Sequence, residues 1–395
     1  MVINNKKIKR IGIDARFYGP IGKGLGRYTQ ELVDNIIKID NENQYVVFLT
    51  KENFDKFKTE NPNVKKVLAD IRWYTLAEQI LFPMILMKEK LDIVHFPHFN
   101  APIFYPKKFI VTIHDLIVHK FPDERATTLN PFIYKIKLLF YKAVIWSAVK
   151  RAKKIIAVSN FTKQDIINEF KIDPDKITVI YEGVSTLSKK ESKDEMNLDD
   201  NKILLGYNIN NPYLLYTGNA YPHKNLEKLI KVFSAIIKKY RNLSLVLVGK
   251  EDYFYKNIKD FARGQNLYNK LDKNDFVKFL GYVPDSHLRI LYKNAVVYIF
   301  PSYYEGFGLP ALEAMVNDCP VLSSNKSSLP EVLGQAAVYF NPESEEEMQT
   351  QIESIINNGS MRQELISQGR AQIKKYSWEK CAAETLNIYK LNIWI

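Results

Sequence analysis

The sequence has few cysteines and no long apolar run. Only Cys319 and Cys381 occur among its 395 residues, too few for the disulfide framework of a small secreted protein. The most apolar stretch, Ile80–Met87, contains a proline and is much shorter than the ~20 residues that span a bilayer. The basic N-terminus leads directly into a strand-like segment, without the apolar core of a signal peptide. We therefore expect a cytoplasmic protein with no transmembrane helix.

Positive charge is concentrated in the first half of the chain. The net charge is +12; residues 1–183 hold 30 Lys and Arg against 20 Asp and Glu, and the remainder holds 26 against 24. Residues 131–150 contain four lysines, five aromatic residues and no acid. That composition suits the headgroup layer of an anionic membrane, but a core-packing helix with a solvated basic face explains it as well. No motif for binding nucleic acid accompanies the charge, so we expect no such partner.

Short runs rich in Val and Ile alternate with longer segments of helical period, a pattern typical of parallel sheets covered on both faces. In the first half we expect strands at 8–13, 45–49, 91–95, 109–113, 154–158 and 177–180, and helices at 25–38, 73–89, 131–151 and 160–170. In the second half we expect strands at 213–217, 243–248, 276–280, 296–300 and 320–323, and helices at 224–240, 252–268, 285–294 and 309–316.

This alternation predicts an α/β protein with two doubly wound, Rossmann-like domains that face one crevice. The segment Ser185–Asn211 is crowded with charged and polar residues and has no sustained apolar period, which favours an interdomain connection. We place the domains at residues 1–195 and 196–376. A final helix within 377–395 is expected to pack back on the first domain.

A glycine-rich loop follows the first expected strand. Gly22, Gly24 and Gly26 stand at alternate positions where a helix begins. Glycine lets backbone amides approach an anion closely, and a helix N-terminus favours negative charge. The spacing matches neither the dinucleotide-binding motif nor a P-loop, so a plain flexible turn remains the alternative.

Histidines follow two neighbouring strands. His114 comes directly after the strand at 109–113, at the edge where α/β sheets bind ligands. His95 and His98 lack nearby acidic or thiol partners at metal-ligand spacing. We therefore interpret His114 as a hydrogen-bonding group in the crevice, with a purely structural histidine as the alternative. Asp173-Pro-Asp175 has the form Asp-x-Asp but is typical of a turn, and we expect no metal and no cofactor.

The second half contains two candidate anion-binding turns. The strand at 213–217 is followed by Gly218 and then by Lys224 at a helix start, where an ammonium can contact phosphate oxygens. Later comes the turn Glu305-Gly306-Phe307-Gly308-Leu309, with Glu313 about one turn into the next helix. Its amides suit a diphosphate, and its carboxylates can accept hydrogen bonds from vicinal hydroxyls. A solvated lysine and a helix-capping glutamate are the alternatives for Lys224 and Glu313.

Glu305 and Glu313, with Gly-Phe-Gly-Leu-Pro between them, resemble the paired-glutamate motif of glycosyltransferase family 4. Members of this family are retaining enzymes of the GT-B fold that use nucleotide-sugar donors. The resemblance spans nearly the whole chain, through Gly24-Leu-Gly26-Arg27-Tyr28, Ala157-Val-Ser-Asn160-Phe-Thr, Gly218-Asn to Lys224-Asn225, Gly281-Tyr-Val-Pro-Asp285 and Ser323-Ser-Asn-Lys-Ser-Ser-Leu-Pro330-Glu331.

The resemblance implies a role for each site residue. It places Glu305 by the hydroxyls of the transferred sugar, Glu313 on the ribose and Val283 near the base. It makes Lys224 a diphosphate ligand, with Gly218 beside it and the amides of Gly306 to Leu309 near the donor sugar and phosphates. His114 approaches the donor sugar from the N-terminal domain, and the Gly22–Gly26 loop faces the diphosphate.

The sequence departs from the family pattern at two places. Members commonly carry an arginine shortly before the phosphate-binding lysine, whereas this chain reads Gly218-Asn-Ala-Tyr-Pro-His223-Lys224. Phosphate neutralisation then depends on Lys224 and the helix dipole, or on a basic residue from elsewhere. The usual glycine after the helix of the second glutamate is also missing; Asn317 stands there and tolerates the left-handed conformation.

The resemblance implies a retaining, metal-independent hexosyltransferase whose residues 196–376 bind a nucleotide-sugar and whose residues 1–195 bind the acceptor. Similarity to mannosyl- and rhamnosyltransferases favours mannose or rhamnose, and a GDP-sugar over a UDP- or dTDP-sugar. The expected acceptor is a lipid-linked or growing surface glycan, as in lipopolysaccharide O-antigen assembly, at the inner face of the plasma membrane with peripheral contact to anionic lipid. A noncatalytic nucleotide-sugar-binding protein, or an epimerase or phosphorylase of the same fold, is the alternative.

Overall fold

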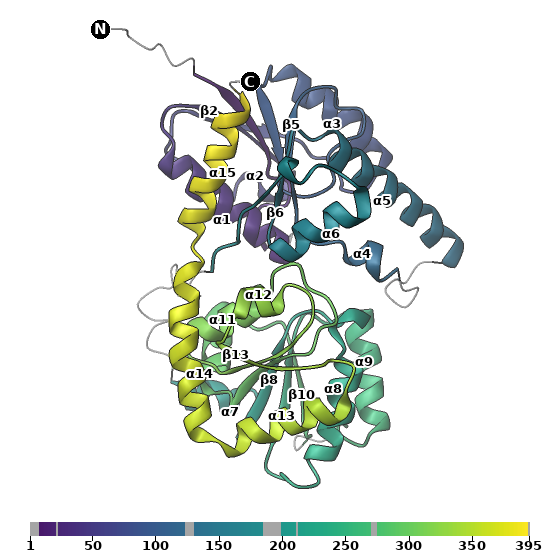
Figure 1. Ribbon diagram of the computed structural model, residues 1–395, viewed down its shortest axis with the longest axis vertical. Coiled ribbons are helices and arrows are strands. Elements are labelled where there is room, and N and C mark those ends of the chain that lie inside the picture. Colours follow the sequence, from purple (N-terminus) through teal and green to yellow (C-terminus); the bar gives the residue numbers. More distant parts are fainter. Residues whose placement is uncertain are drawn as a thin grey trace. The chain divides into compact units, whose positions relative to one another are not determined.

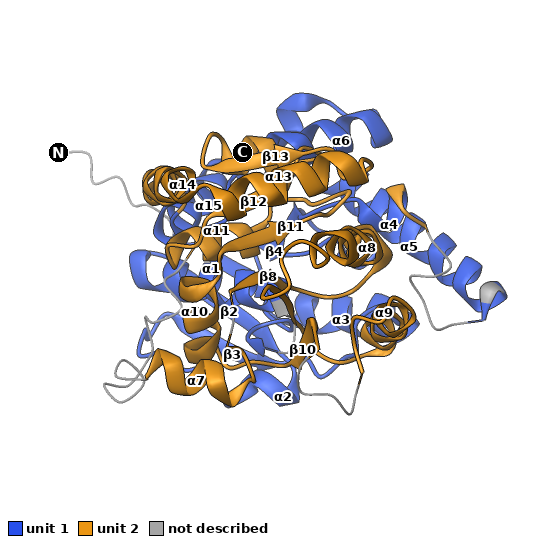
Figure 2. Ribbon diagram, turned by 90° about the horizontal axis from the view of Figure 1, so that it is seen from below, with its two compact units in different colours: residues 1–119, 130–183, 377–395 blue, residues 120–129, 184–376 orange. Residues whose placement is uncertain are grey.

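The computed structural model describes residues 8–20, 23–122, 130–184, 199–210, 212–269 and 275–393. The chain forms two compact units (Figure 2): unit 1 comprises Met1–His119, Asn130–Gly183 and Ser377–Ile395, and unit 2 comprises Lys120–Leu129 and Val184–Tyr376. The predicted domain boundary between residues 195 and 196 lies outside the described residues, as does Gly22. The C-terminal segment groups with the first half of the chain.

Unit 1 is built on a seven-stranded parallel sheet with the order β3-β2-β1-β4-β5-β6-β7. Its central strands are apolar and buried because helices cover both faces, as in β5, where all five residues are buried. The strands are β1 Arg10–Asp14, β2 Gln44–Leu49, β3 Val64–Leu68, β4 Ile93–Phe96, β5 Phe109–Ile113, β6 Lys154–Ala157 and β7 Ile177–Val179.

The helices of unit 1 lie on the two faces of this sheet. Right-handed crossovers place α1 and α2 on one face and α3, α5 and α6 on the other, because the chain runs from β1 outward to β3 and then returns to β4 on the other side of β1. The helical segments are α1 Lys23–Ile39, α2 Lys51–Phe54, α3 Leu76–Lys88, α4 Ile117–Lys120, α5 Pro131–Arg151, α6 Asn160–Phe170, the 3-10 helix η3 Pro174–Lys176 and α15 Trp378–Ile393.

The C-terminal helix α15 packs beside α1 (Figure 1). A buried polar chain fixes it to the sheet: the Tyr389 hydroxyl lies 2.6 Å from Nδ1 of His95, and Nε2 of His95 lies 2.8 Å from Oγ1 of Thr112. Lys153 adds a hydrogen bond from its ammonium to the Asn392 carbonyl. Burial lowers the pKa of His95 to about 3, so this imidazole is neutral at pH 7 and joins a hydroxyl on each side.

Unit 2 has a six-stranded parallel sheet with the order β10-β9-β8-β11-β12-β13. Its strands are β8 Tyr213–Thr217, β9 Ser244–Val248, β10 Val277–Gly281, β11 Val297–Phe300, β12 Val321–Ser324 and β13 Ala337–Phe340. Its helical segments are α7 Asp200–Gly206, η5 Pro222–Lys224, α8 Leu226–Ile236, α9 Tyr253–Gly264, α10 Asp285–Asn294, α11 Leu309–Val316, α12 Leu329–Leu333, α13 Glu345–Asn357, α14 Gly359–Gln372 and η6 Ile373–Lys375.

The strand order of each sheet reverses at one point, between β1 and β4 in unit 1 and between β8 and β11 in unit 2. Open α/β sheets bind ligands outside the carboxyl ends of the strands at such points. This confirms the α/β fold class with two doubly wound sheets.

The structure corrects the prediction for residues 185–211. Within that segment, residues 200–206 form helix α7. Asp199 caps its N-terminus, and the Asp199 side chain accepts hydrogen bonds from the amides of Asn201 and Lys202. The helix packs on α10, and Lys293 pairs with Asp200 across the contact. Strands β3 and β13 were not predicted; both lie at sheet edges and are only partly buried.

In the described parts of the chain, no helix combines the length and the apolar character that crossing a bilayer requires.

Candidate functional site

The turn that carries Lys224 follows β8 and is rigidly held. Gly218 has a φ of +147°, and a Cβ atom there would lie 2.8 Å from the Tyr216 hydroxyl. That hydroxyl donates to the Asn219 carbonyl, and Tyr255 donates to the Gly218 carbonyl. Any other residue at position 218 would be both strained and crowded. Gly218 therefore allows the chain to turn tightly at the end of the strand.

Asn225 attaches this turn to the rest of the sheet edge. It adopts the left-handed conformation between the short helix η5 and α8. Its side-chain amide donates to the carbonyls of Pro301 and Pro342, which follow β11 and β13. Burial, with the Lys224 charge as a smaller effect, lowers the pKa of His223 to about 2. Lys224 is therefore flanked by a neutral histidine and a structural asparagine.

The second turn follows β11 and carries Glu305. The backbone amide of Glu305 donates a hydrogen bond to Oγ of Ser327. The Ser328 hydroxyl donates to the Glu305 carbonyl and lies 3.3 Å from the Phe307 carbonyl oxygen. Gly308, at φ +105°, precedes α11, and a Cβ atom there would lie 2.9 Å from Leu329. The two serines and this glycine fix the path of the backbone before the helix.

Lys224 and Glu305 meet in a short ion pair. Their Nζ and Oε1 atoms are 2.6 Å apart, and their side chains are 12% and 10% exposed. The ammonium has three donors and the carboxylate about four acceptor positions, so this bond leaves both groups with capacity for a ligand. The structure thus brings together two residues that lie 81 positions apart in the sequence.

The other predicted residues of unit 2 take different positions. Glu313 lies on α11 and is partly exposed. Val283 is buried after β10, beside the highly exposed Tyr282. The Phe307 ring packs edge-on against Tyr376 at 5.5 Å between centroids, so its side chain is part of the core. Gly306 and Leu309 complete the backbone between the glutamates.

In unit 1, His114 follows β5 and is bonded through both ring nitrogens. Nδ1 lies 2.8 Å from a carboxylate oxygen of Glu182, and Nε2 lies 2.9 Å from the Pro97 carbonyl oxygen. Burial acts to lower the pKa of His114, but the hydrogen bond and charge of Glu182 and the bond to the Pro97 carbonyl raise it by more. Because both nitrogens face acceptors, the geometry fits an imidazolium that donates twice.

The rings around His114 include an aromatic neighbour from α1. The Tyr28 ring meets it edge-on at 4.5 Å between centroids and also contacts Trp378 of the C-terminal helix. His98 stacks at 6.2 Å, and burial lowers its pKa to about 3. Helix α15 therefore contributes directly to the packing around His114.

The glycine-rich loop of unit 1 combines a crowded position and an open one. A Cβ atom at Gly26 would lie 2.0 Å from the Gly19 carbonyl oxygen, whereas one at Gly24 would meet no atom within 4 Å. Gly26 is thus required by packing. Packing does not require Gly24, which lies exposed in the first turn of α1.

Metal-binding arrangements are not found among the described residues: none of them forms a group of three or more His, Cys, Asp and Glu side chains suited to a metal ion. Asp173 caps the N-terminus of the short 3-10 helix η3, and its carboxylate accepts a hydrogen bond from the Asp175 amide. This confirms that Asp173-Pro-Asp175 is a turn.

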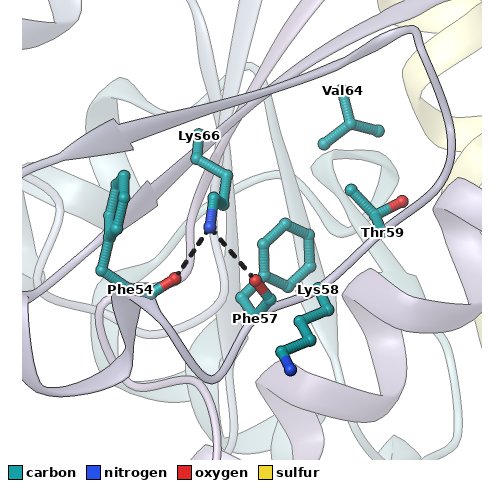
Figure 3. Close-up of a pocket in the computed structure, with 6 residues that line it drawn as sticks. All are labelled: Phe54, Phe57, Lys58, Thr59, Val64 and Lys66. Atoms are coloured by element: carbon teal, nitrogen blue, oxygen red, sulfur yellow. Dashed lines mark hydrogen bonds between the residues drawn. The ribbon is translucent and has the colours of Figure 1, made fainter.

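A pocket at the edge of unit 1 does not involve the predicted site residues (Figure 3). The ammonium of Lys66 donates to the carbonyls of Phe54 and Phe57 and lies 4.5 Å from the Phe54 ring centre. This lysine therefore secures the end of α2. The pocket is lined by Phe54, Phe57, Lys58, Thr59, Val64 and Lys66.

Sequence reasoning missed the partners that hold the site residues. Glu182 follows β7 at a strand's carboxyl end, and that position was the available signal. Ser327 and Ser328 belong to a segment that supported the family resemblance, but their bonds to the Glu305 turn connect two separate loops. Such contacts require knowledge of which strands are neighbours.

Comparisons with known proteins agree with this geometry. Two protein-family models match the chain. The family described as "Glycosyl transferases group 1" matches residues 199–372, and the family described as "Glycosyltransferase Family 4" matches residues 22–186. O-antigen chain mannosyltransferase B of Escherichia coli is 30% identical over 383 residues, covering 93% of this chain and 96% of that protein. The chain belongs to glycosyltransferase family 4.

Two further similarities fit this family. The O-antigen chain mannosyltransferase RfbU of Salmonella typhimurium is 28% identical over 288 residues, 73% of this chain and 71% of that protein. Sucrose-phosphate synthase from Thermosynechococcus elongatus has the same fold, with a TM-score of 0.74, 19% identity and coverage of 97% and 98% of the two chains. This family 4 chain is thus a glycosyltransferase with the GT-B fold.

Proposed function

We propose that the protein is a retaining hexosyltransferase that moves mannose or rhamnose from a nucleoside-diphosphate donor to an acceptor hydroxyl. We assign GDP as the nucleotide and a lipid-linked or growing surface glycan as the acceptor, at the cytoplasmic face of the plasma membrane. The two O-antigen chain mannosyltransferases among its relatives support the sugar and the acceptor.

The Lys224–Glu305 pair is the observation that carries the proposal. Both residues follow neighbouring strands, β8 and β11, where the order of the sheet reverses. A diphosphate can bind the remaining ammonium donors of Lys224, and sugar hydroxyls can donate to Glu305. The nearby N-terminus of α11 adds backbone amides and a favourable dipole for the phosphates. Glu313, on the same helix, is assigned to the ribose hydroxyls.

The chemistry needs no covalent nucleophile from the protein. The bond between the anomeric carbon and the β-phosphate oxygen breaks while the acceptor oxygen attacks the same face of the sugar. The acceptor's proton passes to the departing phosphate oxygen. Lys224 and the amides of Gly306 to Leu309 stabilise the negative charge that develops on the diphosphate, without a metal ion.

His114 contributes through its charge in this proposal. Both of its ring nitrogens are hydrogen-bonded, one to Glu182 and one to the Pro97 carbonyl. A hydrogen bond from His114 to a sugar would therefore require one of these two bonds to break. A positively charged imidazolium favours a ligand that becomes more negative during the reaction. The Gly22–Gly26 loop is assigned to the diphosphate, and the exposed, uncrowded Gly24 suits close approach of an anion.

The test is a donor panel read by thermal shift and by transfer. GDP-, UDP-, dTDP- and ADP-sugars are compared on the wild type and on Glu313→Ala, with Glu346→Ala, an exposed residue of α13, as the control. A ligand at 100 times its dissociation constant stabilises by about 2.7 kcal/mol. We expect GDP-sugars to stabilise the wild type and the control but not Glu313→Ala.

Transfer is then measured with the stabilising donor and a lipid extract that contains glycan acceptors, in the presence of a chelator. Retained anomeric configuration in the product, read by NMR, is the expected result. Nucleotide binding without nucleotide release would favour a noncatalytic sensor, turnover without an acceptor would favour an epimerase, and dependence on free phosphate would favour a phosphorylase. A strict requirement for divalent metal would contradict the assigned role of Lys224.

A further inference from the structure

Helix α3 presents an apolar stripe to solvent. Leu76, Ile80, Met84 and Met87 are all exposed, with Leu76 at 72%. Their spacing of four, four and three residues places them along one side of the helix. The opposite side is buried against the sheet through Phe82 and Leu86. The helix is thus apolar on the side that packs and also on the side that faces water.

Helix α5 has a second stripe of the same kind. Phe132, Ile136, Leu139 and Trp146 are exposed and share one side of the helix, with Leu139 at 68%. Its C-terminal half buries Ile145, Ala148 and Val149 in the core that also contains Phe82 and Leu86. Packing against the core therefore explains only part of the apolar character of residues 131–150.

The two stripes lie on the same face of the seven-stranded sheet and are physically linked. Helix α3 lies in the connection from β3 to β4 and helix α5 in the connection from β5 to β6, and both connections cross the same face of the sheet (Figure 1). The segment between α3 and β5 bridges them: Gln79 of α3 accepts from the Ile103 amide, and the Arg151 guanidinium of α5 donates to the carbonyls of Ile103 and Tyr105. Phe104, 66% exposed, lies on this bridge.

The surface concentrates exposed apolar side chains to an unusual degree. Eleven of the 22 large apolar side chains that are exposed among the described residues belong to it. We call this set the α3–α5 surface; it comprises Leu76, Ile80, Leu81, Met84, Met87, Phe104, Phe132, Ile133, Ile136, Leu139 and Trp146. Exposed apolar side chains gathered in this way on one face of a folded unit mark a contact site.

Charge indicates what the α3–α5 surface contacts. Across both helices the only acidic residue is Glu78, which is buried and paired with Arg16. Lys135 and Lys142 are exposed beside the apolar stripe of α5, seven residues apart on one flank. Exposed apolar side chains flanked by lysines, with no exposed acid, complement an anionic lipid interface.

We propose that the α3–α5 surface docks unit 1 on an anionic membrane. Its apolar side chains enter the boundary between headgroups and acyl chains, and its lysines lie among the lipid phosphates. This inference goes beyond the transferase reaction and does not depend on the identity of the donor or the acceptor.

The test is sedimentation with vesicles of phosphatidylcholine, with and without about 30% phosphatidylglycerol. We expect binding to the anionic vesicles that weakens between about 0.1 M and about 0.5 M salt. One lysine near such a surface changes partitioning about fivefold, so Lys135→Ser/Lys142→Ser is expected to lower it about 25-fold. Met84→Ser/Leu139→Ser, with one change on each helix, is expected to lower it at least about tenfold.

Two control variants match these changes elsewhere on the protein. Lys256→Ser/Lys374→Ser removes the same charge from exposed positions of unit 2, and Leu205→Ser/Leu391→Ser removes exposed leucines outside the α3–α5 surface. Both controls should bind vesicles as the wild type does. Circular dichroism establishes that all variants are folded, and the donor thermal shift should be unchanged in all of them. That readout separates a failure of membrane docking from a failure of the proposed reaction.

Several results would overturn the proposal. If the wild type binds neither kind of vesicle, the α3–α5 surface is not a membrane-docking surface. If the test variants bind vesicles as the wild type does, the membrane-binding surface lies elsewhere on the protein. Equilibrium sedimentation tests the remaining alternative, that a second copy of the chain binds to this surface. A wild-type dimer that Met84→Ser/Leu139→Ser converts to a monomer, with vesicle binding unchanged, would make the α3–α5 surface a self-association interface.

Discussion

The two units hold their charged site residues in different ways. In unit 2, Lys224 and Glu305 share a bond of 2.6 Å between groups that have further donors and acceptors to offer. In unit 1, His114 donates through one ring nitrogen to Glu182 and through the other to Pro97. The unit 2 pair can bind a ligand and keep its internal bond. The histidine must lose a bond or act through its charge alone.

The outer surfaces differ as well. Among the residues that the structure describes, 22 large apolar side chains are exposed, and five of these belong to unit 2: Phe121, Leu205, Tyr253, Phe276 and Tyr282. Unit 1 holds the other 17, most of them on α3 and α5. The charged pair with further bonding capacity is thus found in unit 2, and most of the exposed apolar side chains lie in unit 1.

The largest expected effect comes from Lys224→Met. Removal of one preorganised group that stabilises developing charge typically costs about 10²- to 10³-fold in kcat. We also expect a loss of about 1–3 kcal/mol in stability, because Glu305 remains without its partner in a mostly buried position. Steady-state kinetics and thermal denaturation measure the two effects.

The matched control is Lys231→Met on helix α8. Lys231 pairs with Glu345, but both side chains are well exposed, and such pairs contribute at most about 1 kcal/mol. This variant should keep its turnover. A Lys224→Met enzyme with wild-type kcat would show that the unit 2 pair is structural, and the contrast between the two units would then disappear.

Two glycine substitutions extend the comparison. Gly308→Ala in unit 2 should cost about 1–3 kcal/mol, because it forces alanine to φ +105° and places a methyl group against Leu329. Gly24→Ala in unit 1 should raise stability by about 0.5–1 kcal/mol, since the position is helical and open. Chemical denaturation measures both values.

The affinity for the sugar donor tests whether Gly24 is part of the donor-binding site. If the glycine-rich loop faces the diphosphate, Gly24→Ala weakens donor binding while it stabilises the fold. Gly264→Ala on α9, another helical glycine with no neighbour within 4 Å of its Cβ position, should stabilise without any change in binding. Equal donor affinity in Gly24→Ala and the wild type would remove the loop from the site.

Much of the fold follows from the sequence because buried parallel strands are continuous apolar runs. β5 and β9 are buried at every residue, and both were predicted. β3 contains two lysines and is only partly buried at the sheet edge, so it has no such pattern. Helix α7 is short and none of its residues is buried, so its charged composition favoured a connection.

The candidate site was predictable where its residues lie in local motifs. Lys224 and Glu305 each follow a predicted strand with a glycine-bearing turn, and the adjacency of β8 and β11 brings them together. The contact of Glu182 with His114 was missed, because the two residues lie 68 positions apart and meet only when β6 and β7 are added to the sheet beside β5. Tyr389 reaches His95 from 294 residues away through the C-terminal helix.

The smallest expected effect is a pH dependence that separates His114 from Lys224. The pKa of His114 in the folded state is raised above its ordinary value of 6.5, since Glu182 and the Pro97 carbonyl outweigh the effect of burial. The ion pair therefore contributes its full stability below pH 6.5 and loses it as pH rises through the folded-state pKa. Each unit of pKa shift corresponds to about 1.4 kcal/mol.

Thermal denaturation of the wild type and Glu182→Gln across pH 6 to 9 measures this contribution. The variant keeps a hydrogen-bond acceptor beside His114 but lacks the charge, so the stability advantage of the wild type should shrink as pH rises. A difference that stays constant with pH would mean that His114 is neutral in the folded protein. In that case one ring nitrogen would lack a proton, and the histidine of unit 1 could accept a hydrogen bond from a ligand after exchange of a single contact.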